Sequence, residues 1–378
     1  MSSLKYWVWL SSVKGIGAVT AKSLLDRFET PEAVFRAGPA DYMDLRGISP
    51  AVAGQLADKN LDAAGKVLAA CMELGFRAIT LRDAEYPDRL ANIYDPPLIL
   101  YVRGKMPAID EEAVVAIVGT RNCTPYGIKA ADKTAYRLAR SGVIVATGLA
   151  RGVDSAAARG ALRGNGRVVG VIGSGLDVVY PPENRALFDD VAAKGAILSE
   201  YPPGTTALPA HFPARNRILS GISLGVAVIE APKKSGALIT AARALEQGRD
   251  VFSLPGNVDA RSCEGSNALL REGAIPFLSA EDIISEYADL YPVEVSEKKE
   301  IDNGPAVDYI DFDKILGALG GDAKTVAETI GAETLQIDEI IVRSGLTAQQ
   351  VLTAVTMLEI NGYTERGNGN YLSLKNPE

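Results

Sequence analysis

Histidine is almost absent from this sequence, because His211 is the only one among 378 residues. A metal site built on two histidines is therefore excluded, and a serine or cysteine nucleophile would have to use His211 as its base. The three cysteines, Cys71, Cys123 and Cys263, are odd in number and far apart, which argues against a disulfide framework and a cysteine-rich zinc site. We expect neither a metal nor a cofactor.

Long apolar runs are also missing. No stretch of about 20 uncharged apolar residues occurs, so a transmembrane helix is excluded. The first residues, MSSLKYWVWLSSVKGIG, contain no apolar region of signal-peptide length, and we expect a cytoplasmic protein without membrane contact. With 47% hydrophobic and 23% charged residues the composition is typical of a globular chain, and its length suits two or three domains.

Acidic residues exceed basic ones, for a net charge of −8, but the excess is uneven. Residues 281–314 hold eleven acidic and three basic residues, and residues 319–378 hold eight and four. In contrast, residues 121–271 hold nineteen basic and twelve acidic residues. The middle of the chain is therefore the plausible place for a polyanion, and the C-terminal piece is not.

The N-terminal residues 1–83 are predicted to form a helical domain, because their apolar residues recur only at helical spacing. Gly15-Ile16-Gly17 before a helix resembles a helix-hairpin-helix turn, in which backbone N–H groups can hold a phosphate, and residues 46–56 look like a degraded second copy. A helical bundle with a glycine cap explains this segment equally well.

The C-terminal part is predicted to hold a linker and a small domain. Residues 286–318 are acidic and contain proline and glycine, as linkers do. Residues 319–378 show two helices joined at Ser344-Gly345-Leu346 and a hairpin around Gly367-Asn368-Gly369. Helix, turn, helix and β-wing is the order of a winged helix.

Residues 84–285 alternate between helical segments and short apolar runs rich in β-branched residues. We expect strands at 114–120, 143–148, 167–173, 196–200, 225–231, 250–256 and 275–279. Continuously apolar runs indicate strands buried on both faces, and their alternation with helices favours an α/β fold with an extended Rossmann-like, doubly wound parallel sheet.

Glycines gather where these strands end. Ligands of open α/β sheets bind beyond the carboxyl ends of the strands, and glycine lets the backbone approach a phosphate closely. The residues in question are Gly119, Gly148, Gly173, Ser174 and Gly175. We expect this edge of the sheet to form an anion-binding rim.

Arginines are expected on the same rim. Arg121 follows the first strand, where a G-x-G-x-x-G fingerprint would need a small residue, so NAD binding is disfavoured and a phosphate contact is favoured. Arg151 follows the second strand. The remaining cluster is Phe212, Arg215, Asn216 and Arg217. An aromatic ring beside positive charge suits a binder of single strands that is indifferent to sequence.

Several of these residues also allow a structural interpretation. Arg215 and Arg217 could form ion pairs at the start of a helix, and Phe212 could be a core residue. Asp154 is better explained as a helix N-cap than as a general base. His211 is expected to be structural or to contact a phosphate, rather than to catalyse.

Several uninterrupted strings resemble the DNA-processing protein A family, DprA, also called Smf. They include IVGTR, TGLARGVDSAAARGAL, GVIGSGLDVVYPPEN, HFPARNRILSG and VIEAPKKSGALITAARALEQGRDVFSLPG. The resemblance covers residues 80–285, and a helical N-terminal domain with a C-terminal winged helix fits the family's common arrangement.

The resemblance implies a non-enzymatic binder of single-stranded DNA that protects incoming DNA in natural transformation, helps to load the RecA recombinase, and forms a homodimer through the Rossmann-like domain. It places the family's phosphate-binding arginine at Arg121 and its Phe-Pro-x-Arg-Asn-Arg string at residues 212–217. Lys233 and Lys234 lie in a family-like position and could add charge. The acidic balance of residues 319–378 favours a protein-contact role there.

An enzyme is the alternative. Phosphoribohydrolases that cleave nucleotides on a similar α/β framework carry a Pro-Gly-Gly-x-Gly-Thr turn near a catalytic glutamate. Here PKKSGALIT lacks that glycine run, and Glu230 precedes it. A nicotinamide dehydrogenase is disfavoured by the missing fingerprint and the single histidine.

Overall fold

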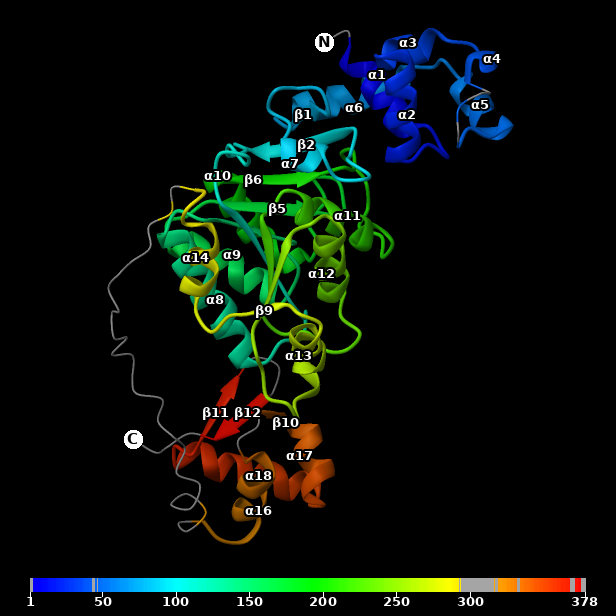
Figure 1. The fold of residues 1–378 in the computed structure, drawn as a ribbon. Helices are drawn as coiled ribbons and strands as arrows, with labels where there is room; N and C mark the ends of the chain where they lie inside the picture. The colour runs from blue at the N-terminus through cyan, green and yellow to red at the C-terminus, as the bar shows by residue number, and fades with distance from the viewer. Residues whose placement is uncertain are drawn as a thin grey trace. The chain divides into compact units, whose positions relative to one another are not determined.

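The computed structural model describes residues 3–42, 45, 47–291, 293, 316, 319–331, 334–367 and 371–374. The chain divides into two compact units, the first made of Met1–Cys123 with Gly127–Val295 and the second of Thr124–Tyr126 with Ser296–Glu378. The first unit holds the N-terminal helices and a large sheet, and the second holds a small domain (Figure 1).

The N-terminal helices pack around their own apolar side chains. They are α1 Leu4–Ser12, α2 Ala18–Phe28, α3 Pro31–Arg36, α4 Pro39–Tyr42, α5 Pro50–Leu56 and α6 Asp62–Glu73. In α2, Ala21, Leu24 and Leu25 are buried, which is the i, i+3, i+4 spacing of one helix face. Of the suggested second turn, Arg46 lies outside the described residues, while Ser49 caps α5 by accepting from the Val52 N–H at 3.3 Å.

A nine-stranded sheet forms the centre of the first unit, in the order β1-β2-β6-β5-β4-β3-β7-β8-β9. The strands are β1 Arg77–Thr80, β2 Ile99–Gly104, β3 Val114–Val118, β4 Ile144–Thr147, β5 Val168–Ile172, β6 Ala196–Ser199, β7 Gly225–Val228, β8 Asp250–Ser253 and β9 Ile275–Pro276. From β6 to β9 all neighbours are parallel, whereas β2 is antiparallel to β1 and β6. The seven predicted strands are thus confirmed as β3 to β9.

The sequence did not reveal β1 and β2. Residues 77–80 were expected to be helical, and that expectation is wrong, because Arg77 to Thr80 pair with Val102 to Ile99 at the edge of the sheet. Four residues are too few to show a period of their own, so pairing with β2 decides their conformation.

Helices cover both faces of the sheet (Figure 1). On one face are α8 Pro125–Arg140, α9 Val153–Arg163, α10 Arg185–Lys194 and α14 Ala280–Tyr287, and on the other are α11 His211–Gly221, α12 Gly236–Glu246 and α13 Glu264–Arg271. Short helices α7 Asp88–Ala91, η1 Pro182–Asn184 and η2 Arg261–Cys263 complete the unit. Along β3, Val115 and Ile117 join the first layer and Val114, Ala116 and Val118 the second. Because alternate side chains of the strand enter two different cores, all of its residues are apolar.

The winding of the sheet reverses at β3. From β3 the chain adds β4, β5 and β6 on one side and then returns to add β7, β8 and β9 on the other. The connections that leave β3 and β7 therefore diverge, and a crevice opens between the carboxyl ends of these two neighbouring strands. The Thr120 N–H donates to the Glu230 carbonyl at 2.7 Å, which ties the two segments together at its base.

The second unit is a winged helix. It consists of α16 Gly321–Ile330, β10 Leu335–Gln336, α17 Ile337–Ser344, α18 Ala348–Ile360, β11 Thr364–Gly367 and β12 Tyr371–Leu374. Gly345 ends α17 with φ +69°, a conformation that favours glycine, and β11 pairs with β12 as the predicted hairpin does. Asn368 and Gly369 of its turn, and most of the predicted linker 286–318, lie outside the described residues.

Candidate nucleic-acid interface

A cavity of about 330 Å³ occupies the crevice at the reversal point of the sheet. Its walls come from four places: the segment after β3, the start of α9, the first turns of α11, and the start of α12. The lining residues used below are Gly119, Arg121, Asp154, Phe212, Arg215, Asn216, Lys234 and Gly236. The cavity lies where topology places ligands in open α/β sheets, and whether this edge of the sheet binds an anion stays a prediction.

Arg215 forms the buried floor of this cavity. Its Nη2 donates to the Gly148 carbonyl at 3.3 Å, and the Asp154 carboxylate acts on its charge. Burial lowers the pKa of Arg215 to about 10, although Asp154 opposes the shift. Burial likewise raises the pKa of Asp154, and Arg215 opposes that shift. Burial thus disfavours the charge on each of the two side chains, and each one offsets part of that effect on the other.

Gly148 gives this arginine its space. A Cβ at position 148 would lie 2.2 Å from Arg215 Nη1 and 2.6 Å from Asp154 Oδ2. Gly119 has a similar role, because a Cβ there would lie 2.5 Å from the Val153 side chain at the start of α9. Both glycines thus permit a side chain of the protein itself to pack against the backbone, and the predicted close approach of a phosphate to them stays a prediction.

Arg121 and Phe212 meet at the mouth of the cavity. The exposed guanidinium of Arg121 lies with Cζ 4.9 Å from the centroid of the half-buried Phe212 ring. The exposed Tyr180 ring packs on Phe212 at 5.6 Å between centroids. No carboxylate among the described residues forms an ion pair with Arg121, so its charge is available to an anion. Cation and aromatic surface thus lie side by side.

The start of α12 closes the cavity. Ser235 caps the helix by accepting from the Ala237 N–H at 3.3 Å, and Asn216 Nδ2 donates to the Gly236 carbonyl at 3.4 Å. The exposed Lys234 lines the cavity, while the exposed Lys233 does not. With Arg121, Arg215 and Lys234 against Asp154, the lining carries three cations and one carboxylate, and the N-terminus of α12 adds positive potential.

Arg217 does not belong to this cavity. It is buried, its Nε donates to Asp95 Oδ2 at 3.1 Å, and its Nη2 donates to Glu200 Oε1 at 2.6 Å. The prediction that its guanidinium shares one open rim with Arg121 is therefore wrong. Arg215 and Arg217 are two residues apart in a helix, and that spacing turns them to different sides.

Other predicted rim residues are occupied elsewhere. Arg151 is exposed and forms an ion pair with Glu183. Ser174 is buried, where its hydroxyl donates to the Val178 carbonyl at 2.8 Å. The Gly175 N–H donates to the Thr205 carbonyl at 2.8 Å, and a Cβ on Gly173 would lie 3.3 Å from His211. None of these four residues lines the cavity with Arg121, and three of them shape the segment after β5; whether any of them contacts DNA stays a prediction.

The structural interpretation holds for His211 and fails for Asp154. His211 Nδ1 lies 3.0 Å from the Gly173 carbonyl, and its ring stacks on Tyr201 at 4.1 Å. The residue at the N-cap of α9 is Gly152, with φ +76°. Asp154 instead lies in the first helical turn and accepts from the Ala150 N–H at 3.4 Å.

The residues that the enzyme alternative needs are not in the cavity. Glu230 is 1% exposed and is not among the lining residues.

The described residues include no group of three histidine, cysteine or carboxylate side chains placed to hold a metal. Within the part of the chain that the structure describes, no helix is both long enough and apolar enough to cross a membrane.

Sequence reasoning missed Tyr180 at this site. The residue lies in the string VVYPPEN, where an aromatic residue precedes two prolines and is not part of an apolar period. An aromatic residue in such a loop is a signal for an exposed ring, because prolines keep the segment out of helix and sheet.

Three family models match separate parts of the chain. The model described as DNA recombination-mediator protein A matches residues 77–288, and the DprA winged helix domain matches residues 314–370. A SAM-like helix-hairpin-helix tandem matches residues 10–59. Whether the turn at Gly15 to Gly17 holds a phosphate stays a prediction.

Characterised relatives and solved structures agree with these matches. Protein Smf of Synechocystis is 34% identical over 97% of this chain and 98% of its own, and DNA processing protein DprA of Bacillus subtilis is 42% identical over 58% and 74%. The crystal structure of Streptococcus pneumoniae DprA is 34% identical, with a TM-score of 0.64, over 74% of this chain and 96% of that one.

A second solved structure is of a related protein that binds single-stranded DNA. It describes the single-stranded DNA binding mode of DNA processing protein A from Helicobacter pylori, with 30% identity and a TM-score of 0.52 over 57% of this chain and 97% of that one. Sheet, winged helix, family models and relatives lead to the same conclusion. The chain belongs to the DNA recombination-mediator protein A family, whose members are named DprA or Smf.

Proposed function

We propose that this protein binds single-stranded DNA at the cavity between the ends of β3 and β7. The observation that carries the proposal is the juxtaposition of Arg121 with Phe212, at the mouth of a cavity whose charged lining is mainly positive. Positive charge that follows a sugar-phosphate backbone, together with aromatic faces for bases, is what binding of a single strand requires.

In the proposed complex, phosphates are held by Arg121, Lys234 and the N-terminus of α12. Arg215 contributes long-range attraction from the floor, and an anion above it would offset the burial of its charge. Bases stack on the surface formed by Phe212 and Tyr180. Because Arg121 already covers Phe212, a base reaches that ring when the guanidinium turns to a phosphate.

The finer part of the proposal rests on the family. We propose that the protein is a cytoplasmic, non-enzymatic recombination mediator that protects incoming DNA during natural transformation and loads RecA, and that it acts as a homodimer through the Rossmann-like domain. The description of the family as a recombination mediator and the DNA-binding relative from Helicobacter pylori support this proposal.

Arg121→Ala tests the DNA site. We expect affinity for a fluorescein-labelled oligo-dT strand to fall about tenfold in anisotropy titrations, and the slope of log affinity against log salt to become shallower by about 0.7, the value for one lost phosphate contact. Arg82→Ala removes the same charge from an exposed position that lines none of the described cavities, and it should bind as the parent does. Equal binding by Arg121→Ala and the parent would refute the site.

Turnover of nucleotides separates the proposal from the enzyme alternative. The parent protein is incubated with nucleoside monophosphates, and free base is measured by chromatography. We expect no release, because Glu230 is buried away from the cavity lining. Release that disappears in Glu230→Gln would establish the enzyme instead.

A further inference from the structure

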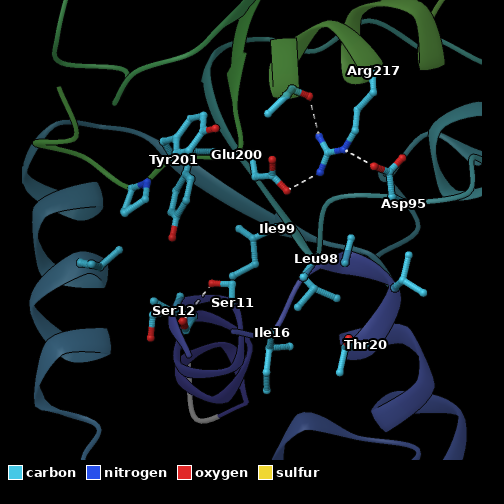
Figure 2. Close-up of a pocket in the computed structure, with 18 of the residues that line it drawn as sticks. Ser11, Ser12, Ile16, Thr20, Asp95, Leu98, Ile99, Glu200, Tyr201 and Arg217 are labelled. Carbon is cyan, nitrogen blue, oxygen red and sulfur yellow. Dashed lines mark hydrogen bonds and ion pairs between the residues drawn. The ribbon is translucent and has the colours of Figure 1, made fainter. Parts of the chain in front are cut away.

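A second, larger cavity of about 780 Å³ lies between the N-terminal helices and the sheet (Figure 2). On the helical side it is lined by residues of α1, of the start of α2 and of α6, among them Ser12, Ile16 and Ala63. On the other side it is lined by β2 and the segment before it, the segment after β6, α11, and Arg243 of α12. Its volume lies in the usual range of small-molecule pockets and is ample for one nucleoside, and its walls are mostly apolar.

One wall of this cavity is polar. Figure 2 shows Arg217 between Asp95 and Glu200, across from Ile16 and Ser12. The Asp95 and Glu200 side chains are 35% and 27% exposed, and each uses one oxygen for Arg217. Among the described residues, no hydrogen bond reaches Asp95 Oδ1 or Glu200 Oε2. Two carboxylate oxygens are therefore available to a ligand that donates hydrogen bonds.

The same wall limits the class of ligand. Asp95 and Glu200 are balanced by Arg217 and Arg243 in the lining, so this cavity lacks the excess of positive charge that the first cavity offers to a phosphate. Apolar walls of Ile16, Leu98 and Ile99 suit the faces of a flat ring, and carboxylate oxygens suit the N–H groups on the edge of a base. The required ligand is planar, mostly apolar on its faces and rich in donors on one edge.

The first turn of α11 connects the two cavities. Pro213 lines both of them, while Phe212 and Arg215 line the first and Ala214 and Arg217 the second. A strand whose phosphates lie in the first cavity can therefore place a neighbouring base over Pro213 and into the second.

We propose that the cavity between the N-terminal helices and the sheet holds one unpaired base of the bound strand, with its donor edge on Asp95 and Glu200. This inference rests on the proposed function. Guanine fits best, because its N1–H and its N2 amine are two neighbouring donors, one for the free oxygen of each carboxylate. Adenine and cytosine offer only an amine, and thymine offers one N–H between two carbonyl oxygens.

The test compares oligonucleotides that differ at one base. The full-length protein is titrated with oligo-dT and with the same strand carrying one central dG. We expect the dG strand to bind about tenfold tighter. Replacing that guanine by hypoxanthine, which lacks the N2 amine, should remove most of the gain. Replacing it by 7-deazaguanine, which keeps both donors, should preserve the gain.

A cavity-filling variant locates the effect. Ala63 is an exposed residue of α6 that lines the cavity, so Ala63→Phe should fill the space and abolish the preference for dG while oligo-dT binding persists. Ala69→Phe makes the same change at an exposed position of α6 that does not line the cavity, and it should keep the preference.

The outcomes separate the inference from the function on which it rests. Binding of oligo-dT by both variants shows that they are folded and that the first cavity works. An unchanged dG preference in Ala63→Phe, or no preference in the parent, would overturn the base site and leave the DNA-binding proposal intact. Failure of the parent to bind either strand would overturn the proposed function itself.

Discussion

Arg121 and Arg215 differ in what a substitution would cost. The Arg121 side chain is exposed and its ring contact with Phe212 is at the surface, so its loss removes an anion contact with little effect on packing. Arg215 is buried beside Asp154 and hydrogen-bonded to the backbone of Gly148. Its removal would leave a buried carboxylate without its counter-charge, which makes Arg121 the cleaner probe of DNA binding.

Gly148→Ala tests whether the buried arginine holds the cavity in shape. The added methyl would lie 2.2 Å from Arg215 Nη1 and 2.6 Å from Asp154 Oδ2, so one or both of these buried side chains would have to move. We expect a loss of about 1–3 kcal/mol in the free energy of unfolding, measured with urea, and weaker binding of oligo-dT because Arg215 is displaced.

Gly65→Ala is the matched control for that change. Gly65 lies within α6, no atom lies within 4 Å of its missing Cβ, and its φ is not in the left-handed region. Alanine there should stabilise the protein by about 0.5–1 kcal/mol and leave DNA binding unchanged. If Gly148→Ala is as stable as Gly65→Ala and binds oligo-dT equally well, then neither stability nor DNA binding depends on the close packing of Arg215 against the strand end.

At the scale of elements, α11 separates two surfaces. Residues 212, 215, 216 and 219 line the cavity at the sheet edge, and residues 214 and 217 line the cavity beside the N-terminal helices. The string HFPARNR was interpreted as one charged cluster, although its helical period places Arg215 and Arg217 on different faces. The alternative of ion pairs at the start of a helix is confirmed for Arg217, and once that helix is assigned its period predicts the separation.

Arg217→Ala should therefore affect stability more than DNA binding. Removal of the guanidinium leaves Asp95 and Glu200 without their shared partner. We therefore expect the free energy of unfolding, measured with urea, to fall by about 2–4 kcal/mol. Arg121→Ala should show the opposite pattern, with normal unfolding and weak binding. A stable Arg217→Ala protein that fails to bind oligo-dT would restore Arg217 as a phosphate contact.

The strands were predictable where burial determines them. Runs such as Val114 to Val118 are apolar throughout because both faces are covered, and such runs are visible in any sequence. The glycines at strand ends are likewise visible in the sequence. The partners of Arg151 and Arg217 were not predictable, because Glu183, Glu200 and Asp95 come from segments whose approach depends on the completed fold. Ion pairs between distant segments leave no period in the sequence.

At the scale of the whole molecule, charge and fold divide the chain in the same way. The winged helix has its own core, formed by residues such as Val326, Ile340, Val355 and Leu372. Residues 319–378 carry twice as many acidic as basic residues, whereas basic residues predominate in 121–271. Long-range attraction of a polyanion should therefore come from the first unit alone.

Removal of residues 296–378 tests this division. Each unit has its own compact set of contacts, so the shortened protein should fold and unfold in one cooperative transition. We expect its affinity for oligo-dT to stay within about twofold of the full chain, with the same dependence on salt, because the cations of the cavity are all retained. A loss of about tenfold together with a shallower salt dependence would mean that basic residues of the winged helix contact the strand despite its acidic balance. A gain in affinity well beyond twofold at low salt that disappears at high salt would contradict this expectation in the other direction, because it would show that the acidic unit repels DNA at long range.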